Sequence, residues 1–281
     1  MRFCMVACLF TALCGCGPSR PPSVKIDPAL ATLVPSDALL LAGVRLEALR
    51  ATPLYRSLGS PAALLSGTGI DLDKVWEILA VSNGRRTAIL ARGKFSDTGL
   101  EPRLDIPGAS RTTYKGYAMT ATDTLAIAFM NPSTAVAGQP DAVRAILDGR
   151  GQSSGPPPAL EKQIEQIGPQ NQIWAVGAGS AELAQAAPRT GNLSNVATAL
   201  RLVETFRIAA QAGPALRIAA TAHCRNQGDA ESLSGALRFF AMLAGLKTSS
   251  GVQIESNGVE VRIDASIPPE TIEKLAGQSQ R

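Results

Sequence analysis

The chain has 281 residues, 45% of them hydrophobic, and its 27 Lys and Arg nearly balance its 23 Asp and Glu. This composition excludes a disordered chain, and the small net charge with only two Trp, three Tyr and seven Phe argues against nucleic acid as a partner. The length suffices for one large domain or two ordinary ones.

An apolar run from Phe3 to Leu13 follows the basic residue Arg2. It has the length of the central region of an export signal and is too short to span a bilayer. The run ends at Leu13-Cys14-Gly15-Cys16. This tetrapeptide resembles the lipobox of bacterial lipoproteins, which has an aliphatic residue, a small residue just before the cleavage site, and a cysteine after it. The resemblance implies cleavage before Cys16 and lipid attachment to its side chain.

Cys14 departs from that family's pattern, which usually has Ala, Ser or Thr at this position. Leu13, directly before Cys14, is too bulky for the pocket of the signal peptidase, which favours Cys16 as the modified residue. Two or three acyl chains on Cys16 would anchor the protein stably, whereas a single chain binds a membrane only marginally. Gly17, in place of Asp, is similar to lipoproteins that are sorted to the outer membrane of Gram-negative cells.

Residues 17–23 form a proline-rich spacer, Gly-Pro-Ser-Arg-Pro-Pro-Ser, without a hydrophobic pattern. An ordinary secretory signal or a buried helix is the alternative interpretation of the apolar run. The spacer favours a lipoprotein, because it would hold a folded part a short distance from a membrane. We therefore expect a signal peptide over 1–15, a lipid-anchored spacer over 16–27 and a folded part that faces the periplasm.

Residues 28–149 are expected to form a first α+β half with an antiparallel sheet. Asn-Gly pairs favour tight hairpins because both residues accept a positive φ, and apolar residues at helical spacing predict the helices. The expected elements are strands Val75–Ser82 and Arg85–Phe95 joined at Asn83-Gly84, strands Thr112–Ala121 and Leu125–Met130 joined at Thr122-Asp123-Thr124, and helices Leu46–Leu58 and Pro140–Asp148.

A stretch rich in Pro, Gly and Ser over 150–158 indicates a flexible linker or an exposed loop, and residues 159–281 a second α+β half. Asp229 is the expected N-cap of a long helix that is apolar almost all round, which predicts a place between layers rather than at the surface. The expected elements are helices Ala159–Ile167, Asp229–Leu246 and Pro269–Leu275, and a hairpin over Val252–Asp264 that turns at Asn257-Gly258.

A weak internal repeat links the two halves. Pro28-Ala29-Leu30 and Pro158-Ala159-Leu160 each precede an apolar segment, Ser36–Val44 and Gln170–Ala178, which we expect as buried strands. The repeat predicts two tandem similar halves, in an α+β fold with an antiparallel sheet and helices on one face.

Residues 192–213 have helical spacing throughout, yet the repeat places a strand in their second part. A helix that ends at Gly213-Pro214 is the alternative. We expect a short helix to about Leu202, followed by a strand over Val203–Gln211 that pairs with Leu216–Cys224.

Residues that carry chemistry are few. His223 precedes Cys224, but neighbouring strand residues point to opposite faces, so this pair is not expected to act together. One His and one free Cys are too few ligands for zinc, so we expect no metal and no cofactor, and no intrachain disulfide. Gly177-Ala178-Gly179 lacks the third glycine and the parallel strands of a dinucleotide site, and Asp71 with Asp73 is typical of a turn.

Four basic residues belong to the second strand of the first hairpin and to its turn. Arg86, Arg92 and Lys94 would share one face of that strand, with Arg85 at the turn. They predict a docking patch for an acidic partner or for anionic lipid headgroups, with an ordinary solvated sheet face as the alternative.

The mature region is also similar to envelope proteins of acidobacterial-type genomes. The similarity rests on Pro35–Ala38, the turn Thr68–Asp71, and Cys224 before Asp229-Ala230, and it implies no particular activity. We expect a non-catalytic scaffold or protein-binding module, anchored to a membrane through Cys16 and contacting another envelope protein.

Two alternatives to this function remain at this point. One is a periplasmic binder of an apolar small molecule, which would need a large apolar pocket between sheet and helices. The other is an enzyme that uses carboxylates alone. Its side chains would come from Asp71, Asp73, Glu77, Glu204 and Asp229.

The lipobox gives the first testable prediction. Replacing Cys16 with Ser removes the thiol that accepts the lipid, so metabolic labelling with a fatty acid and sedimentation with membranes should both be lost. The matched control Cys14→Ser should leave both intact. Labelling that persists in Cys16→Ser and disappears in Cys14→Ser would contradict the assignment.

Overall fold

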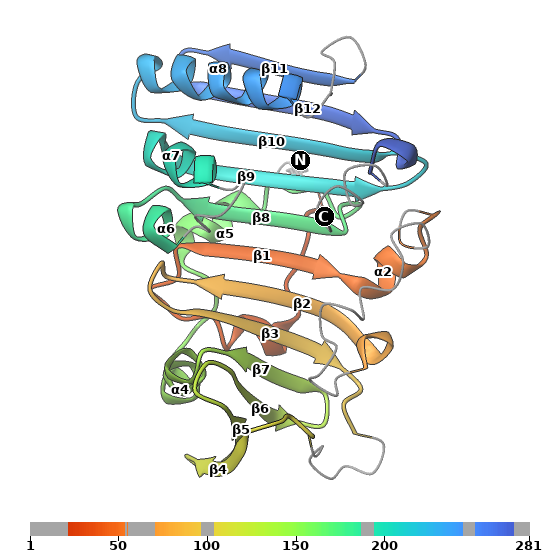
Figure 1. Cartoon of the computed structure of the whole chain (residues 1–281), viewed down its shortest axis with the longest axis vertical. Helices are drawn as coiled ribbons and strands as arrows, with labels where there is room; N and C mark the ends of the chain where they lie inside the picture. Colours follow the sequence, from red (N-terminus) through yellow and green to blue (C-terminus); the bar gives the residue numbers. More distant parts are fainter. Residues whose placement is uncertain are drawn as a thin grey trace, which may run out of the picture.

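The computed structural model of this protein describes residues 22–53, 55, 71–96, 104–186, 194–243 and 251–272, so the expected signal and Cys16 lie outside the described residues. Twelve strands form one antiparallel sheet in the order β11-β12-β10-β9-β8-β1-β2-β3-β7-β6-β5-β4 (Figure 1). The strands are β1 (Leu40–Arg45), β2 (Val75–Ser82), β3 (Thr87–Gly93), β4 (Ser110–Tyr114), β5 (Tyr117–Ala121), β6 (Ala126–Asn131), β7 (Thr134–Gly138), β8 (Ile173–Ala178), β9 (Val203–Ala212), β10 (Leu216–Cys224), β11 (Val252–Asn257) and β12 (Glu260–Ile267).

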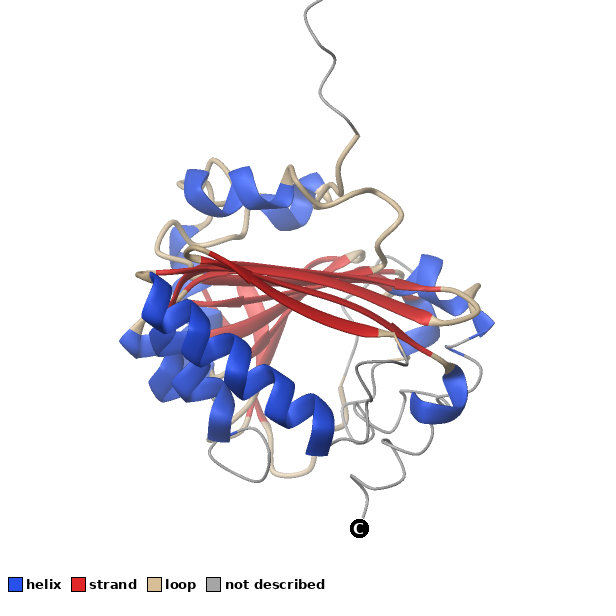
Figure 2. Ribbon diagram, turned by 90° about the horizontal axis from the view of Figure 1, so that it is seen from above, coloured by secondary structure: helices blue, strands red, loops and turns tan. Residues whose placement is uncertain are grey.

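Helices lie on both faces of this sheet, where the sequence had led us to expect one (Figure 2). We call the face covered by α1, α4 and α5 the upper face, and the opposite one the lower face. The α+β class with an antiparallel sheet is confirmed. The helices are α1 (Pro28–Ala31), α2 (Leu46–Arg50), the short 3₁₀ turn η2 (Leu72–Lys74), α4 (Pro140–Gly149), α5 (Pro158–Ile164), α6 (Ala181–Ala186), α7 (Ser194–Leu202) and α8 (Gln227–Leu243).

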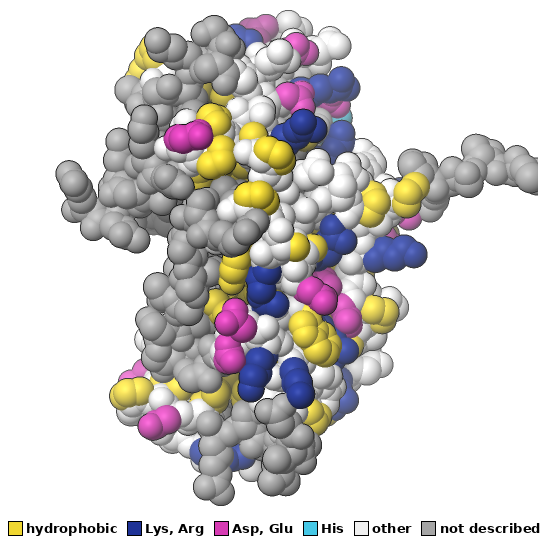
Figure 3. Space-filling view, turned by 90° about the vertical axis from the view of Figure 1, so that its right-hand side faces the viewer, with side chains coloured by type: hydrophobic (Ala, Val, Ile, Leu, Met, Phe, Trp, Pro, Cys, Tyr) yellow, Lys and Arg dark blue, Asp and Glu magenta, His cyan; other side chains and the backbone are white. Residues whose placement is uncertain are grey.

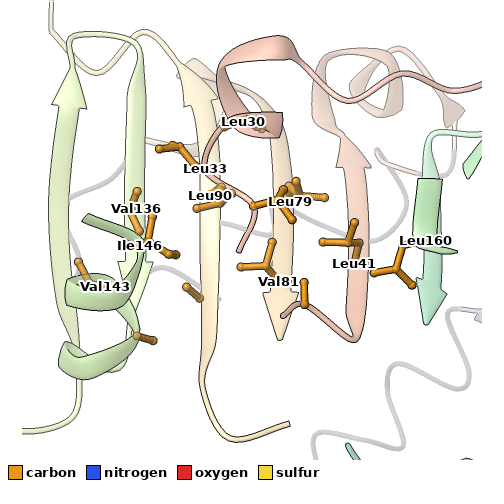
Figure 4. Close-up of a cluster of buried hydrophobic side chains, with 14 of the residues drawn as sticks. Leu30, Leu33, Leu41, Leu79, Val81, Leu90, Val136, Val143, Ile146 and Leu160 are labelled. Carbon is orange, nitrogen blue, oxygen red and sulfur yellow. The ribbon is translucent and has the colours of Figure 1, made fainter. Parts of the chain in front are cut away.

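The largest core lies between the upper face and the helices above it. Alternate residues of the central strands point upward, and fully buried members such as Leu41, Leu79 and Leu90 meet Leu30 of α1 and Leu160 of α5 (Figure 4). Side chains of α4 close the same core over β3, β6 and β7. Burial of this apolar surface is the main force that holds the three helices in place.

Three smaller clusters lie on the lower face. Under the second half, Val203 and Val252 pack against Leu233 of α8. Under the first half, Leu46 of α2 belongs to a second cluster and Phe129 of β6 to a third. The first half of the sheet is therefore apolar on both sides, whereas among the described residues the outer strands β10, β12 and β11 bury apolar side chains on the lower side only.

The two halves of the chain meet at the pairing of β1 with β8. Leu41 lies opposite Val176 and Gly43 opposite Trp174. Outward from this pair the strand order is β1-β2-β3-β7-β6 on one side and β8-β9-β10-β12-β11 on the other, so the two orders correspond. The repeated Pro-Ala-Leu begins α1 and α5, which precede the two central strands. This correspondence supports the predicted duplication.

The ambiguous segment folds as predicted. Helix α7 ends at Leu202, and β9 begins at Val203 and pairs along its length with β10. Burial of Val203, Ala210 and Ala212 on the lower face explains why tertiary packing overrides the helical spacing there.

Helix α8 differs from its prediction in two respects. Asn226, not Asp229, caps it, since the Asn226 side-chain oxygen accepts a hydrogen bond from the Asp229 amide at 2.9 Å. The helix also lies at the surface, with Phe239 53% and Met242 64% exposed, because only one side of it contacts β10, β11 and β12. Residues 244–246 of the predicted helix lie outside the described residues.

The predicted strand 112–121 is a hairpin of its own, β4–β5, which turns at Lys115 and Gly116 with φ of 48° and 83°. Strand β7 was not predicted from the sequence, and the hairpin β11–β12 turns at Gly258-Val259, one residue later than expected, because Asn257 pairs with Glu260. The helix Pro140–Gly149 and the start of the helix at 269 agree with prediction. Helix α5 ends at Ile164, three residues before the predicted end, and α2 ends at Arg50 rather than at Leu58, because the chain leaves the helix at residues 51 and 52. Residues 56–58 and 273–275 lie outside the described part.

The indole of Trp174 lies directly on Gly43, so a Cβ at residue 43 would overlap the ring. Because Trp174 is 2% exposed and cannot move away, Gly43→Ala should lower the free energy of unfolding by about 1–3 kcal/mol, the usual cost of overpacking. Gly235→Ala, on the open side of α8, is the control and should raise it by about 0.5–1 kcal/mol. Urea denaturation measures both changes, and equal effects would contradict the packing role of Gly43.

Candidate binding groove

The upper face of the second half is an open groove of about 710 Å³. Strands β9, β10, β12 and β11 form its floor, and the loop after α5 forms one wall. Its polar lining includes Gln170, Arg207, Gln211, Arg217, Gln253 and Asp264.

Strict alternation along β10 creates this face. Leu216 and Ala222 contribute to the cores under the sheet, and Ile218, an even number of residues from both, points the same way. Arg217 and Ala219 alternate with these residues, so their side chains point to the upper face. Small residues such as Ala209 and Ala219 then leave the centre of the floor low. The groove therefore follows from small upward-facing residues between longer polar ones.

The charged side chains of the groove are positioned differently. The Arg207 guanidinium donates a hydrogen bond to the Gln166 side-chain oxygen, which ties β9 to the loop wall. Arg217 and Asp264 are exposed on neighbouring strands and have no hydrogen bond or ion pair with another described residue. One cation and one anion are thus available to a partner.

His223 and Cys224 diverge, as the alternation predicted. The His223 Nε2 atom lies 3.3 Å from a carboxylate oxygen of Glu260, the first residue of β12. The Cys224 side chain points the other way and is 2% exposed in the lower core. Burial raises the pKa of the Cys224 thiol. This thiol is therefore a packing group and not a nucleophile.

The N-terminal end of the described chain enters the fold beside the groove. The Val24 amide donates to the Ile167 carbonyl at 2.7 Å, and Ile167 is part of the groove wall. Asp27 then caps α1, and its second carboxylate oxygen pairs with the Arg92 guanidinium at 3.1 Å. The end of the spacer, from Val24 to Asp27, is thereby fixed to the upper face.

The predicted basic patch is not assembled. Arg85 and Arg86 lie at the turn of the first hairpin, and Arg92 and Lys94 at the other end of β3. Arg92 is 19% exposed, because it pairs with Asp27 and donates to Ser133 and Thr134. On the side of the molecule where β3 ends, basic and acidic side chains are interspersed (Figure 3).

The five carboxylates that the sequence suggested for an enzyme lie apart. Asp71 caps η2 by accepting from the Asp73 amide at 3.0 Å, Glu204 is exposed at the start of β9, and Asp229 lies in the first turn of α8. Glu77 and Asp229 are partly buried, Glu77 near Arg45 and Arg92. None of the five lines the groove.

The glycine motif likewise proves structural. Gly177 and Ala178 end β8, and the side chain of Phe206 packs on Gly177 from the neighbouring strand. Among the described residues no group of three or more His, Cys, Asp or Glu could hold a metal ion. No described helix is long and apolar enough to cross a membrane.

Arg207, Arg217 and Asp264 were not predicted from the sequence as site residues. The sequence did carry a signal for Arg217 and Asp264. Arg217 on β10, and Arg262 and Asp264 on the paired strand β12, are charged residues that alternate with apolar ones. What alternation cannot reveal is that helices cover one half of the upper face and leave the other open.

Comparison with known proteins gives a fold and no family. No protein-family model and no curated protein matches the chain. Among solved structures, crystal form I of TP0453 matches with a TM-score of 0.51 and 13% identity over 90% of this chain and 98% of that one. Crystal form III of TP0453 matches with a TM-score of 0.55 and 11% identity over 90% and 99%. The chain therefore shares the overall fold of TP0453 along nearly its whole length.

Glu77 gives a prediction on pH. Burial raises its pKa above the ordinary value of 4.5. The hydrogen bond from the Asp27 amide and the positive charges of Arg45 and Arg92 lower the pKa, but by less than burial raises it. A raised pKa means that folding disfavours the ionised form, so this group's contribution to stability is lost as pH rises through the folded-state pKa.

Glu77→Gln removes that ionisation. Its free energy of unfolding relative to the unmodified protein should therefore increase between about pH 4 and pH 8, as measured by urea denaturation at each pH. Glu204→Gln, which removes one carboxylate at an exposed position, is the matched control. A Glu77→Gln difference that is constant with pH would contradict the assignment.

Proposed function

We propose that this protein is a lipid-anchored envelope protein that acts without catalysis, by binding a protein partner through the groove. Cys16 would hold it to the membrane. The observation that carries the proposal is the open polar face over β9, β10, β12 and β11, with Arg217 and Asp264 available to a partner.

The position of the spacer supports this proposal. Pro22 is six positions after Cys16, and at most about 3.6 Å per residue this length of chain reaches about 20 Å. Because Val24 is bonded to Ile167 in the groove wall, the anchor would keep the groove close to the membrane surface. A partner in or on the same membrane would then meet the groove at a high effective concentration.

The chemistry of the groove favours a protein as its occupant. Its lining mixes amides, one carboxylate and two guanidinium groups above small residues, and it has no aromatic platform for a sugar or a base. Mixed donors and acceptors of both charges match the polar surface or an extended segment of another protein.

Photocrosslinking in intact envelopes tests the proposal. A photoreactive residue in place of Arg217 should crosslink to one discrete protein, whereas the same residue in place of Phe239, exposed on α8, should not. Adding Asp264→Arg to the Arg217 probe should reduce the product several-fold, because it reverses the charge of the neighbouring strand.

Cys16→Ser, which removes the anchor, should reduce the crosslinked product as well. Crosslinks of equal yield from positions 217 and 239, or a product that the Asp264→Arg change leaves intact, would overturn the groove as the binding surface.

A further inference from the structure

A cavity of about 310 Å³ lies in the first half, away from the groove. It is enclosed by the loop after α1, by α4 and by the turn end of β2 and β3. Its floor is apolar and belongs to the main core, with Val34, Ala38, Val81, Ala88 and Ile146 all no more than 5% exposed.

Small residues account for this cavity. Ala142, Ala145 and Gly149 recur on the side of α4 that lines it, opposite Ala38 and Ala88. Leucine and valine fill the corresponding space elsewhere in the same core. A volume of about 300 Å³ is at the lower end of the range of small-molecule sites, which suits a compact ligand.

The mouth of the cavity is polar and held in place by hydrogen bonds. The Asn83 amide donates to the Asp37 carboxylate at 2.7 Å, and its oxygen accepts from the Arg86 amide at 2.9 Å. The Ser153 hydroxyl donates to the Val34 carbonyl at 2.6 Å, which fixes the loop after α4 as the opposite edge. The stretch expected as a flexible linker thus forms an ordered wall.

Arg86 is the one cation that lines the mouth, and its guanidinium makes no hydrogen bond or ion pair with any other residue of the described chain. Asp37 lines the same mouth, but its carboxylate already accepts from Asn83. A guanidinium with free donors beside an apolar cavity is a ready partner for a carboxylate.

We infer that this cavity binds a small molecule with an apolar body and a single carboxylate head. The body lies on the floor formed by Val34, Val81 and Ile146, and the head accepts hydrogen bonds from Arg86 at the mouth. The charge of Asp37 on the same mouth restricts the ligand to one negative charge. This site is independent of the groove and of its proposed partner.

Calorimetric titration tests the inference with the mature chain, from residue 16 onward, carrying Cys16→Ser, which has neither the lipid nor the apolar export signal. Octanoate should bind, and octan-1-ol, which has the same chain without the charge, should bind at least about tenfold more weakly. Arg86→Met should lower the affinity for octanoate by about tenfold and leave that for octanol unchanged. The adjacent Arg85→Met, outside the cavity lining, should change neither.

A second pair of variants tests the location. Ala145→Leu fills the cavity and should abolish binding of both probes, whereas Arg144→Leu, exposed one position earlier on α4, should not. Circular dichroism establishes that each variant is folded. Octanol that binds as tightly as octanoate, equal losses in Arg85→Met and Arg86→Met, or unchanged binding in folded Ala145→Leu would each overturn the proposal. Loss of the membrane partner would not affect these titrations.

Discussion

The pairing of β1 with β8 is the constraint on which the rest of the structure depends. These strands begin the two halves, and each would be the exposed edge of a smaller sheet if the halves were apart. Five facing residue pairs join them, and Trp174 seals the join by lying on Gly43, where a larger residue has no room. One continuous sheet follows, and with it the fact that the groove and the cavity lie on the same face.

Corresponding strand orders do not give the halves corresponding surfaces, because their connections differ. From β3 the chain forms the hairpin β4–β5, and α4 later closes the upper face of the first half. From β10 the equivalent connection is α8, which packs below the sheet. Helix α4 therefore covers the upper face of the first half, with the cavity beneath it, whereas the upper face over β9, β10, β12 and β11 is open. Two halves with the same strand order thus present two different surfaces.

Local signals in the sequence predicted much of this framework. Asn83-Gly84 and the repeated Pro-Ala-Leu located a hairpin and both central strands, since turn chemistry and buried strands depend on neighbouring residues. Prediction failed where the structure depends on contacts between residues that are far apart in the sequence. The exposure of Phe239 and Met242 depends on the packing of α8 on the sheet through one side only. The burial of Arg92 depends on its ion pair with Asp27, which is far away in sequence. The sites were missed for the same reason, because Arg86 and Ala145 are ordinary residues until the fold places them around one space.

The attachment of the spacer connects these surfaces to the proposed anchor. Asp27 caps α1, accepts from Arg92 and donates its amide to Glu77, so the last residues before the fold are bound to β2 and β3 rather than free to swing. Val24 extends this attachment to the wall of the groove. A lipid on Cys16 would therefore restrict the orientation of the whole sheet as well as its distance from the membrane, since a short tether fixed to the upper face favours arrangements in which that face is turned toward the bilayer. Because the groove lies on that face, its partner would approach from the membrane side.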